Sequence, residues 1–524
     1  MRSLLMLSAA VLLVAPADAQ SRRRSRASAA RPVVGINLAG PADWNTELPF
    51  EDMFRFARPW VSQTRGAAWG KGPPLAVDER GWVRELAEGA FAESAVCTVQ
   101  GGHYPTGEYT LRFDGKGSLD LSNGNTVKRK GSGQVTFRVD AANRSMLLRL
   151  RETDPKDPVR NVRLLIPGAA GGSKSSPFRA DFLQRWAGFS AIRFKDWMLT
   201  DNSAIQGWDE RPLVEDATWS RKGVPVEVMV ELANRLQADP WFCMPHQADD
   251  EYVRQFAQLV KARLNRSLRV YVEYSNELWN GIYEQTRWTQ DQGAKAQLAT
   301  QRRVAGWRYG AARSVEMFDI WEEVFGGTKR LVRVLASQAY NPYVSEQVLS
   351  HEDAYTKTDA LAVAPYISLN AGPQSDPTAD EVARWDLDRL FEHIDERALP
   401  RATAAMAQQK EIADRYGLQL VAYEAGQHLV GIGSGQNNRR VEALFKAANA
   451  DPRMEQVYDR YHAAWAKVGG GMMCHFSSVT AWSKYGSWGL LQYADDDPSA
   501  SPKLRAVRSW ARAQGQKLSK QRAR

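Results

Sequence analysis

Apolar and polar positions follow their most regular pattern from about residue 178 onward. Short runs rich in β-branched, aliphatic and aromatic residues alternate there with longer amphipathic stretches of helical period. The apolar runs cover residues 190–194, 240–246, 268–276, 331–337, 360–365, 419–424 and 471–476, and an earlier run covers residues 33–37. Apolar strands that alternate with helices are typical of a parallel sheet buried on both faces. Eight of them predict an α/β fold of the TIM-barrel type, a (β/α)8 barrel.

Helical periodicity is clearest in five stretches that lie between the expected strands. They are residues 178–187, 224–237, 251–264, 307–325 and 402–416. A further short helix is expected at residues 52–57, where Pro59 prevents continuation. We expect these helices to connect the strands and to cover the outside of the barrel.

Residues 61–168 have a different pattern of short alternating runs, at residues 109–113, 135–139, 146–150 and 162–166. They are separated by turn sequences such as D-G-K-G at 114–117, N-G-N at 123–125 and G-S-G at 131–133. Regular short strands with such turns predict an antiparallel β-sandwich. It would be inserted between barrel strands 1 and 2, and the Gly- and Ser-rich residues 168–177 would form a linker.

The two ends of the chain differ from its body. Residues 1–20 combine a positive start, a short apolar run and Ala17-Asp18-Ala19, which is the pattern of a secretory signal peptide. The apolar run is short for a membrane span, and no later run approaches 18 apolar residues. We therefore expect a secreted or periplasmic protein without a membrane span.

The expected domain organisation follows from these patterns. It comprises a signal peptide at 1–20, a basic disordered segment at 21–31, the first barrel strand and helix at 32–60, the inserted sandwich at 61–168, the remainder of the barrel at 169–512 and a basic tail at 513–524.

The formal net charge of +9 arises at the ends of the 524-residue chain. Residues 21–31 contain five arginines, residues 517–524 contain two lysines and two arginines, and neither segment has an acidic residue. These nine charges equal the whole excess, so the body is near neutral and no nucleic-acid partner is expected. Cys97, Cys243 and Cys474 are too few and too scattered for a disulfide framework.

Titratable, polar and aromatic residues stand where the expected strands end. The carboxyl ends of the strands are where a barrel of this type builds its site. These residues are Asn37, Arg193, His246, Asn276, Glu277, Tyr366, Glu424 and, just past the eighth strand, Trp482.

The fourth strand carries two carboxylates, in the stretch R-V-Y-V-E-Y-S-N-E-L-W-N at residues 269–280. Glu273 and Glu277 share one face of the strand. Glu273 lies deeper and is expected to be structural, paired with a cation inside the barrel. Glu277 lies at the strand end and is expected to face Glu424 across the barrel. Glycoside hydrolysis uses such a pair, in which one group protonates the leaving oxygen and the other attacks or activates water.

The pattern Glu273-x-x-Asn276-Glu277 after the fourth strand, with Glu424 ending the seventh, resembles the clan of retaining (β/α)8 glycoside hydrolases that includes cellulases and mannanases. The resemblance covers most of the chain outside the insert. It implies that Glu277 is the acid/base and that Glu424 is the nucleophile. A β-linked poly- or oligosaccharide would be cleaved with retention, without a cofactor or a metal ion.

The resemblance also implies which side chains bind the substrate. They are Asn276, Arg193, His246, Tyr366 and Trp482. Asn37 is a further candidate because of its place at a strand end, and Trp279, Trp482 and Trp488 could supply apolar walls and sugar-stacking faces. Asn276 would bond the sugar 2-hydroxyl, Arg193 and Tyr366 would hold the nucleophile ionised and oriented, and Trp482 would be a stacking platform. Two alternatives stay open: Lys195 or Asp196 ends the second strand in place of Arg193, and His246 is a structural histidine.

Many members of the clan read Asn-Glu-Pro, whereas Leu278 and Trp279 follow Glu277 here, so the subfamily is not assigned. One alternative within the clan is an α-L-arabinofuranosidase or another exo-acting glycosidase. An alternative from another class is a non-catalytic polysaccharide-binding protein on a barrel scaffold. The pattern of short strands in the predicted sandwich resembles that of a carbohydrate-binding module, and a purely structural lid is an equally good interpretation.

Other chemistries lack their sequence patterns. The chain has no G-x-x-x-x-G-K-[ST] phosphate loop, no H-E-x-x-H zinc helix and no G-x-S-x-G elbow. Asp495-Asp496-Asp497 lacks the spaced ligands of an EF-hand and is expected to be a solvated acidic turn.

Overall fold

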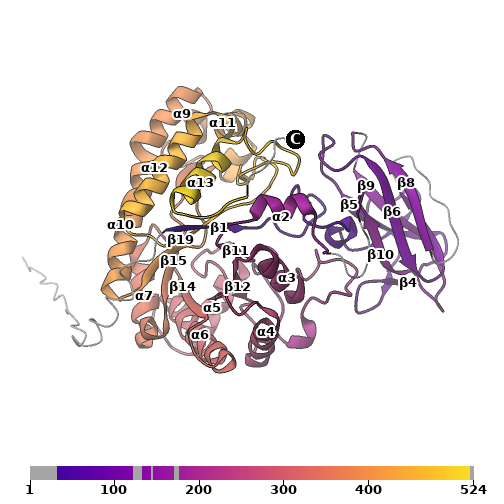
Figure 1. Cartoon of the computed structure of the whole chain (residues 1–524), viewed down its shortest axis with the longest axis horizontal. Helices are drawn as coiled ribbons and strands as arrows, with labels where there is room; N and C mark the ends of the chain where they lie inside the picture. Colours follow the sequence, from indigo (N-terminus) through magenta and orange to yellow (C-terminus); the bar gives the residue numbers. More distant parts are fainter. Residues whose placement is uncertain (1–31, 122–132, 143–144, 170–175, 520–524) are drawn as a thin grey trace, which may run out of the picture.

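A closed barrel of eight parallel strands forms the centre of the protein (Figure 1). The computed structural model describes residues 32–121, 133–142, 145–169 and 176–519. In order around the barrel the strands are β1 (Val33–Asn37), β11 (Ala191–Arg193), β12 (Asp239–Met244), β13 (Val270–Tyr274), β14 (Leu331–Ala336), β15 (Ala360–Val363), β17 (Gln419–Ala422) and β19 (Met472–His475). β1 pairs with β11 on one side and β19 on the other, which closes the barrel. The predicted barrel is therefore confirmed.

Helices surround the strands, as expected for apolar strands that need cover on their outer face. They are α2 (Ala180–Trp186), α3 (Val226–Leu236), α4 (Asp250–Arg263), α5 (Glu284–Lys295), α6 (Arg302–Phe325), α7 (Pro342–Ser350), α8 (Ala379–Val382), α9 (Leu387–His393), α10 (Leu399–Arg415), α11 (Arg439–Ala450), α12 (Arg453–Lys467) and α13 (Pro502–Ala513). The five predicted helical stretches coincide with α2, α3, α4, α6 and α10. Residues 53–56 form a 3-10 helix capped by the Asp52 side chain.

Helix α5 differs from the other barrel helices because its buried face is polar. Its buried residues are Gln285, Thr286, Thr289 and Gly293. A helix without an apolar stripe gives no strong periodic signal. The polar face has a structural use, because Gln285 and Thr286 bond the backbone of the segment that carries Glu277.

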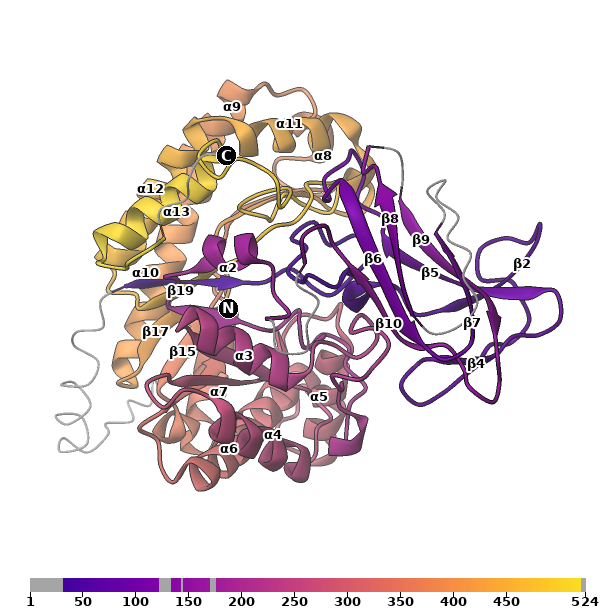
Figure 2. The same cartoon turned by 45° about the vertical axis from the view of Figure 1, so that its right-hand side comes forward.

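Antiparallel strands fill the sequence between β1 and β11 and lie to one side of the barrel (Figures 1 and 2). One sheet has the order β2 (Val61–Thr64), β5 (Ala90–Cys97), β9 (Met146–Thr153) and β7 (Gly117–Leu121), and another has the order β10 (Arg160–Leu165), β6 (Gly107–Asp114) and β8 (Gly133–Val139). A small pair is formed by β3 (Ala76–Val77) and β4 (Val83–Glu85). Alternate side chains of β6 and β9 enter one shared apolar cluster. We call the antiparallel strands together the insert.

The insert is tied to the segment that follows β1. Thr98 donates its backbone N–H to the Asp43 carbonyl over 2.8 Å and its hydroxyl to the Asp43 carboxylate over 2.9 Å. Arg58 donates two hydrogen bonds to the same carboxylate, over 3.0 and 2.9 Å. Because Asp43 is only 3 % exposed, these bonds fix the loop between β1 and the insert.

Two short strands outside the barrel extend its carboxyl-terminal end. β16 (Ile367–Ala371) and β18 (Gln427–Gly431) pair in parallel, with Ile367 opposite Gln427. They directly follow the segments that carry Tyr366 and Glu424. These two strands were not predicted from the sequence, where the expected strands end at residues 365 and 424.

Several predictions concern the ends of the chain. The signal peptide at 1–20 and the basic segment at 21–31 lie outside the described residues, as do the turns at 123–125 and 131–132, most of the linker and residues 520–524. Residues 514–519 of the predicted tail pack against the barrel, where Gln516 bonds the backbone of Val34 and Gly188. Among the described residues, every helix is too short or too polar to cross a bilayer.

Candidate active site

The segment after β13 holds Glu277 in an unusual backbone conformation. Ser275 and Glu277 have φ angles of 59° and 43°, in the left-handed region that non-glycine residues rarely adopt. Such a residue costs on the order of 1–3 kcal/mol and persists only where its surroundings hold it. Here Gln285 donates to the Asn276 carbonyl over 3.0 Å, and the Asn280 N–H donates to the Glu277 carbonyl over 2.9 Å. The turn aims the Glu277 side chain over the barrel.

The half-buried Glu277 carboxylate has two donors. The Tyr423 hydroxyl donates to Oε1 over 3.0 Å, and the Asn280 amide donates to Oε2 over 2.9 Å. Tyr423 directly precedes Glu424, so a single side chain links the two carboxylate-bearing segments. This hydrogen bond joins the segment after β13 to the segment after β17.

The Glu424 carboxylate is 6 % exposed and is held at both oxygens. Arg193 donates to Oε1 over 3.0 Å and the Tyr366 hydroxyl donates to Oε2 over 2.8 Å. Burial raises the pKa of Glu424 to about 7, against the lowering effect of the Lys195 and Arg193 charges. The negative charge of Glu277 acts in the same direction as burial, which places the two carboxylates within electrostatic reach of each other.

Arg193 connects the barrel interior to this carboxylate. It is fully buried, and its Nη2 atom lies 3.0 Å from Glu273 Oε2 and 3.0 Å from Asn276 Oδ1. Its Nη1 atom also bonds Asn37 Oδ1 over 3.2 Å. Removing one partner of a buried ion pair costs about 3–5 kcal/mol, so this guanidinium is central to the arrangement. The predicted pairing of Glu273 with a barrel cation is confirmed.

The side-chain amide of Asn37, at the end of β1, bonds residues at the ends of three other barrel strands, β11, β17 and β19. Its nitrogen donates to the Tyr423 carbonyl over 2.9 Å and to the His475 carbonyl over 3.2 Å, while its oxygen accepts from Arg193. Asn37 is 1 % exposed. It therefore helps to fix the segment after β17 that carries Glu424.

A second buried cation lies beside the first. The Lys195 ammonium is 2.7 Å from Asp196 Oδ1 and 3.1 Å from Asp201 Oδ2. Asp201 in turn accepts from the Asn276 amide over 2.9 Å and from Gln285 over 2.7 Å. Burial opposes the ionisation of Asp201, but Lys195 and these hydrogen bonds outweigh it and lower its pKa. Sequence analysis named Lys195 and Asp196 only as alternative strand ends, and it missed Asp201 and Gln285.

Asn276 is consequently occupied by protein at both ends of its amide. Its oxygen accepts from Arg193, and its nitrogen donates to Asp201. The second N–H of the amide is the group left for a substrate. Asn276 is only 2 % exposed, so a sugar hydroxyl can reach this N–H only in direct contact with the amide.

Aromatic rings form a wall beside Glu424. The ring centroids of Tyr366 and His428 are 5.3 Å apart, those of His428 and Trp488 are 4.8 Å apart, and those of Phe476 and Trp488 are 5.9 Å apart. Trp488 is half-buried, which leaves ring surface for a ligand. The predicted platform Trp482 has other contacts: its indole N–H donates to the Gly489 carbonyl, and the Lys503 ammonium lies 4.7 Å from its ring. The structure thus brings Trp488, rather than Trp482, into ring contact with Tyr366.

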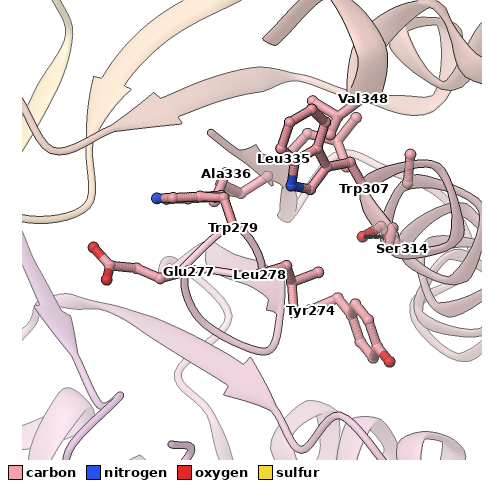
Figure 3. Close-up of a pocket in the computed structure, with 12 residues that line it drawn as sticks. Tyr274, Glu277, Leu278, Trp279, Trp307, Ser314, Leu335, Ala336 and Val348 are labelled. Atoms are coloured by element: carbon pink, nitrogen blue, oxygen red, sulfur yellow. Dashed lines mark hydrogen bonds between the residues drawn. The ribbon is translucent and has the colours of Figure 1, made fainter. Parts of the chain in front are cut away.

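A narrow apolar pocket lies behind Glu277 (Figure 3). Leu278 and Trp279 line it together with residues of α6 and β14, and its volume of about 20 Å³ holds about one water molecule. The Glu277 carboxylate points away from Trp307 and Ser314 (Figure 3). A Cβ on Gly310 would lie 2.5 Å from Leu278 Cδ1, so the glycine gives Leu278 its space. Leu278 therefore anchors the turn that presents Glu277.

Trp279 and His246 flank this region. The Trp279 ring lies 6.2 Å from that of Tyr423. His246 is 3 % exposed, its Nδ1 atom has no hydrogen-bond partner among the described residues, and burial lowers its pKa to about 4. Its ring meets Trp288 edge-on at 6.0 Å. The Nδ1 atom is itself buried, and Nε2 lies 3.3 Å from the side-chain nitrogen of Gln247.

In the part of the chain that the structure describes, one group has the geometry of a metal site. His103, Asp495 and Asp496 bring ligand atoms within 4.8 Å of one another. His103 Nδ1 already bonds Asp495 over 3.0 Å, and its ring stacks on Tyr493 at 3.5 Å. These contacts join the insert to the barrel, and they lie apart from the two glutamates.

The sequence matches no protein-family profile and no curated protein. Solved structures that match part of this chain include a 4-O-α-L-rhamnosyl-β-D-glucuronidase from Fusarium oxysporum, with 9 % identity and a TM-score of 0.37 over 63 % of this chain and 62 % of that one. A Bacteroidetes-affiliated GH5 cellulase has 12 % identity and a TM-score of 0.35, over 63 % and 86 % of the two chains. An endo-β-1,4-mannanase from Thermotoga petrophila has 11 % identity and a TM-score of 0.33, over 64 % and 72 %. The matched part spans about three fifths of the first of these proteins.

Proposed function

We propose that this protein is a glycoside hydrolase that cleaves a β-linked poly- or oligosaccharide with retention. The observation that carries the proposal is the pair of carboxylates at the ends of β13 and β17. Glu277 and Glu424 face the same end of the barrel, and the Tyr423 hydroxyl connects their segments. The Glu277 carboxylate is half-buried and that of Glu424 is almost fully buried, so their environments suit two different roles, acid/base and nucleophile.

In the first step the Glu424 carboxylate attacks the anomeric carbon while the bond to the leaving oxygen breaks. Glu277 gives its proton to that oxygen, so the leaving group departs as a neutral alcohol. A covalent glycosyl ester of Glu424 results. In the second step Glu277 takes a proton from water, the water oxygen attacks the anomeric carbon, and the ester bond breaks to release the sugar and the Glu424 carboxylate.

The surrounding residues serve this chemistry by position and charge. Arg193 and Tyr366 bond the two oxygens of Glu424, which fixes the direction of attack and favours the ionised form. Asn276 offers one remaining N–H toward the sugar. The Trp488 and Trp279 rings give apolar surfaces that suit the flat face of a sugar ring. The signal-like residues 1–20 support secretion or export to a periplasm.

A screen of the purified protein against a panel of β-glucans, β-mannans, xylans and arabinans tests the proposal. We expect one class of polysaccharide to be cleaved, with product sizing separating endo from exo action. Proton NMR of the first product formed should show the anomer of the substrate. An inverted product would contradict the covalent step. Saturable binding without any turnover would instead favour a polysaccharide-binding protein, and release of single arabinose units would favour an arabinofuranosidase.

On the acidic side of the pH profile, kcat/KM should begin to fall near pH 7. Glu424 has to be ionised to attack, and burial raises the pKa of Glu424 to about 7 despite the nearby cations. Below this pH the active form is lost, and kcat/KM should fall by about tenfold per pH unit. The measurement is kcat/KM of an uncharged substrate between pH 5 and 9, with enzyme returned to pH 7.5 after each exposure to check that it stays folded. A constant kcat/KM between pH 5 and 7 would show that the pKa of Glu424 in the free enzyme is not raised to about 7.

A further inference from the structure

A cleft of about 720 Å³ opens among the loops that follow β1, β11 and β19. Three parts of the chain line it: the segment between β1 and β2, the loop after β11, and the loop after β19. The side chains that matter here are Trp44, Arg58, Asp196, Phe476 and Trp488. A cleft of this volume has room for a small ligand or for sugar units of a longer one.

The cleft lies next to the surroundings of Glu424. Trp488 lines it, and its ring lies 6.2 Å from the ring of Tyr366, which bonds the Glu424 carboxylate. Asp196 also lines it and bonds Lys195. None of the residues in the pocket behind Glu277 takes part. The cleft therefore extends from the nucleophile's side of the candidate active site.

Trp44 is placed on a rigid part of the cleft. Its side chain is 63 % exposed, although its neighbours in sequence are fixed. Asp43 carries the bonds from Arg58 and Thr98, and the Asn45 amide donates to the carbonyls of Ala39 and Gly40 over 3.1 and 2.7 Å. A single exposed ring is ordinary on a protein surface. An exposed indole on a fixed loop that borders a cleft next to a reaction centre offers a preformed stacking surface.

The charges in the cleft favour a neutral ligand. The Arg58 guanidinium is paired with Asp43 through two hydrogen bonds, so it is not free to bind an acid. Asp196 uses Oδ1 for Lys195 and leaves Oδ2 as an acceptor, and Ser220, Ser477 and Thr480 also line the cleft. Hydroxyl acceptors and donors between indole rings match the chemistry of an uncharged sugar.

We propose that this cleft binds uncharged sugar units of the substrate beyond the one that reacts, with Trp44 as a stacking surface. This inference rests on the proposed function. The sugar units would lie on the side of the scissile bond that stays attached to Glu424 in the glycosyl-enzyme, because the cleft extends from Glu424 and not from Glu277. Arg58 and Thr98, which directly follows β5 of the insert, hold the loop that carries Trp44 through their hydrogen bonds to Asp43.

The test compares Trp44→Ala and Trp44→Phe with a matched control, Trp69→Ala, because Trp69 is 40 % exposed and does not line the cleft. The probes are β-1,4-linked gluco- and manno-oligosaccharides of two to six units and the 4-nitrophenyl β-glycosides of glucose and mannose. Trp44→Ala should lower kcat/KM by about tenfold for the longest cleaved oligosaccharide and leave that of the shortest cleaved probe unchanged. Trp44→Phe should restore part of the loss, and Trp69→Ala should behave as wild type at every length.

An equal loss at all lengths, or no loss at any, would overturn the subsite. If the wild type cleaves none of the probes, the proposed function fails for these sugars, and the subsite is decided by calorimetric titration with the hexasaccharides. Binding by wild type that is weakened about tenfold in Trp44→Ala would support the subsite in that case. Binding that Trp44→Ala leaves unchanged, or no binding by wild type, would overturn it.

Discussion

Replacing Glu424 by glutamine should lower kcat on the order of 10⁴-fold or more while leaving sugar binding nearly intact. The neutral amide keeps the size of the carboxylate but cannot form the glycosyl ester, and loss of a covalent nucleophile has effects of this order or larger. The shorter Glu424→Ala variant should be equally inactive. Turnover is measured by reducing-sugar release, and binding by calorimetry with the same oligosaccharide.

The folded state should survive the Glu424→Gln substitution. Arg193 keeps its ion pair with Glu273 and its bond to Asn276, so its charge remains compensated. A matched control is Glu93→Gln, because Glu93 is also a buried glutamate (4 % exposed) but pairs with Arg149 inside the insert. The control should keep wild-type kcat and KM. Hydrolysis by Glu424→Gln at the wild-type rate would contradict the nucleophile assignment.

The barrel and the ends of its strands could be predicted from sequence because both depend on local patterns. Each of the eight strands is a short apolar run bounded by polar residues, so its existence did not depend on its neighbours. Once a parallel barrel was inferred, its geometry brought all carboxyl ends together. Glu277, Glu424, Arg193 and Tyr366 could therefore be grouped, although the last strand residue of β13 is Tyr274 and the glutamate lies in the turn beyond it.

The contacts that decide the roles of these residues were beyond prediction from a single sequence. Asp201 follows no strand end, and it enters the site only because Lys195 and Asn276 meet there in three dimensions. Tyr423 reads as an ordinary apolar strand residue, yet its hydroxyl bonds Glu277. No periodicity encodes such pairs between segments that are far apart in the chain.

The same reason explains the difference between Trp482 and Trp488. Both lie in the long loop after β19, and sequence analysis had no means to tell which ring turns toward Tyr366. The structure pairs Trp482 with Lys503 and the Gly489 carbonyl, and it pairs Trp488 with His428, Phe476 and Tyr366. Long loops take their path from packing, which single-sequence patterns do not record.

Replacing Glu277 by glutamine should produce a loss whose size depends on the leaving group. For an oligosaccharide, whose leaving oxygen needs a proton, kcat/KM should fall by about 10²–10⁴-fold, the usual contribution of a general acid. For a 2,4-dinitrophenyl glycoside of the same sugar, the phenolate departs without protonation, so kcat/KM should fall much less. Because Glu277 also activates water in the second step, this substrate should give a burst of dinitrophenolate followed by slow turnover.

Comparison of Glu277→Gln with Glu424→Gln distinguishes the loss of the acid from the loss of the nucleophile. A missing nucleophile should stop cleavage of both substrates alike, whereas a missing acid should spare the one that needs no proton. Asn280→Ala is a further comparison, because Asn280 donates to Glu277 Oε2 and acts through that carboxylate, so its loss should lower kcat/KM more for the oligosaccharide than for the dinitrophenyl glycoside, by a smaller factor than Glu277→Gln. Equal losses for the two substrates in Glu277→Gln would rule out Glu277 as the acid. A burst in Glu424→Gln in place of Glu277→Gln would require the two roles to be exchanged, with Arg193 and Tyr366 then supporting the acid rather than the nucleophile.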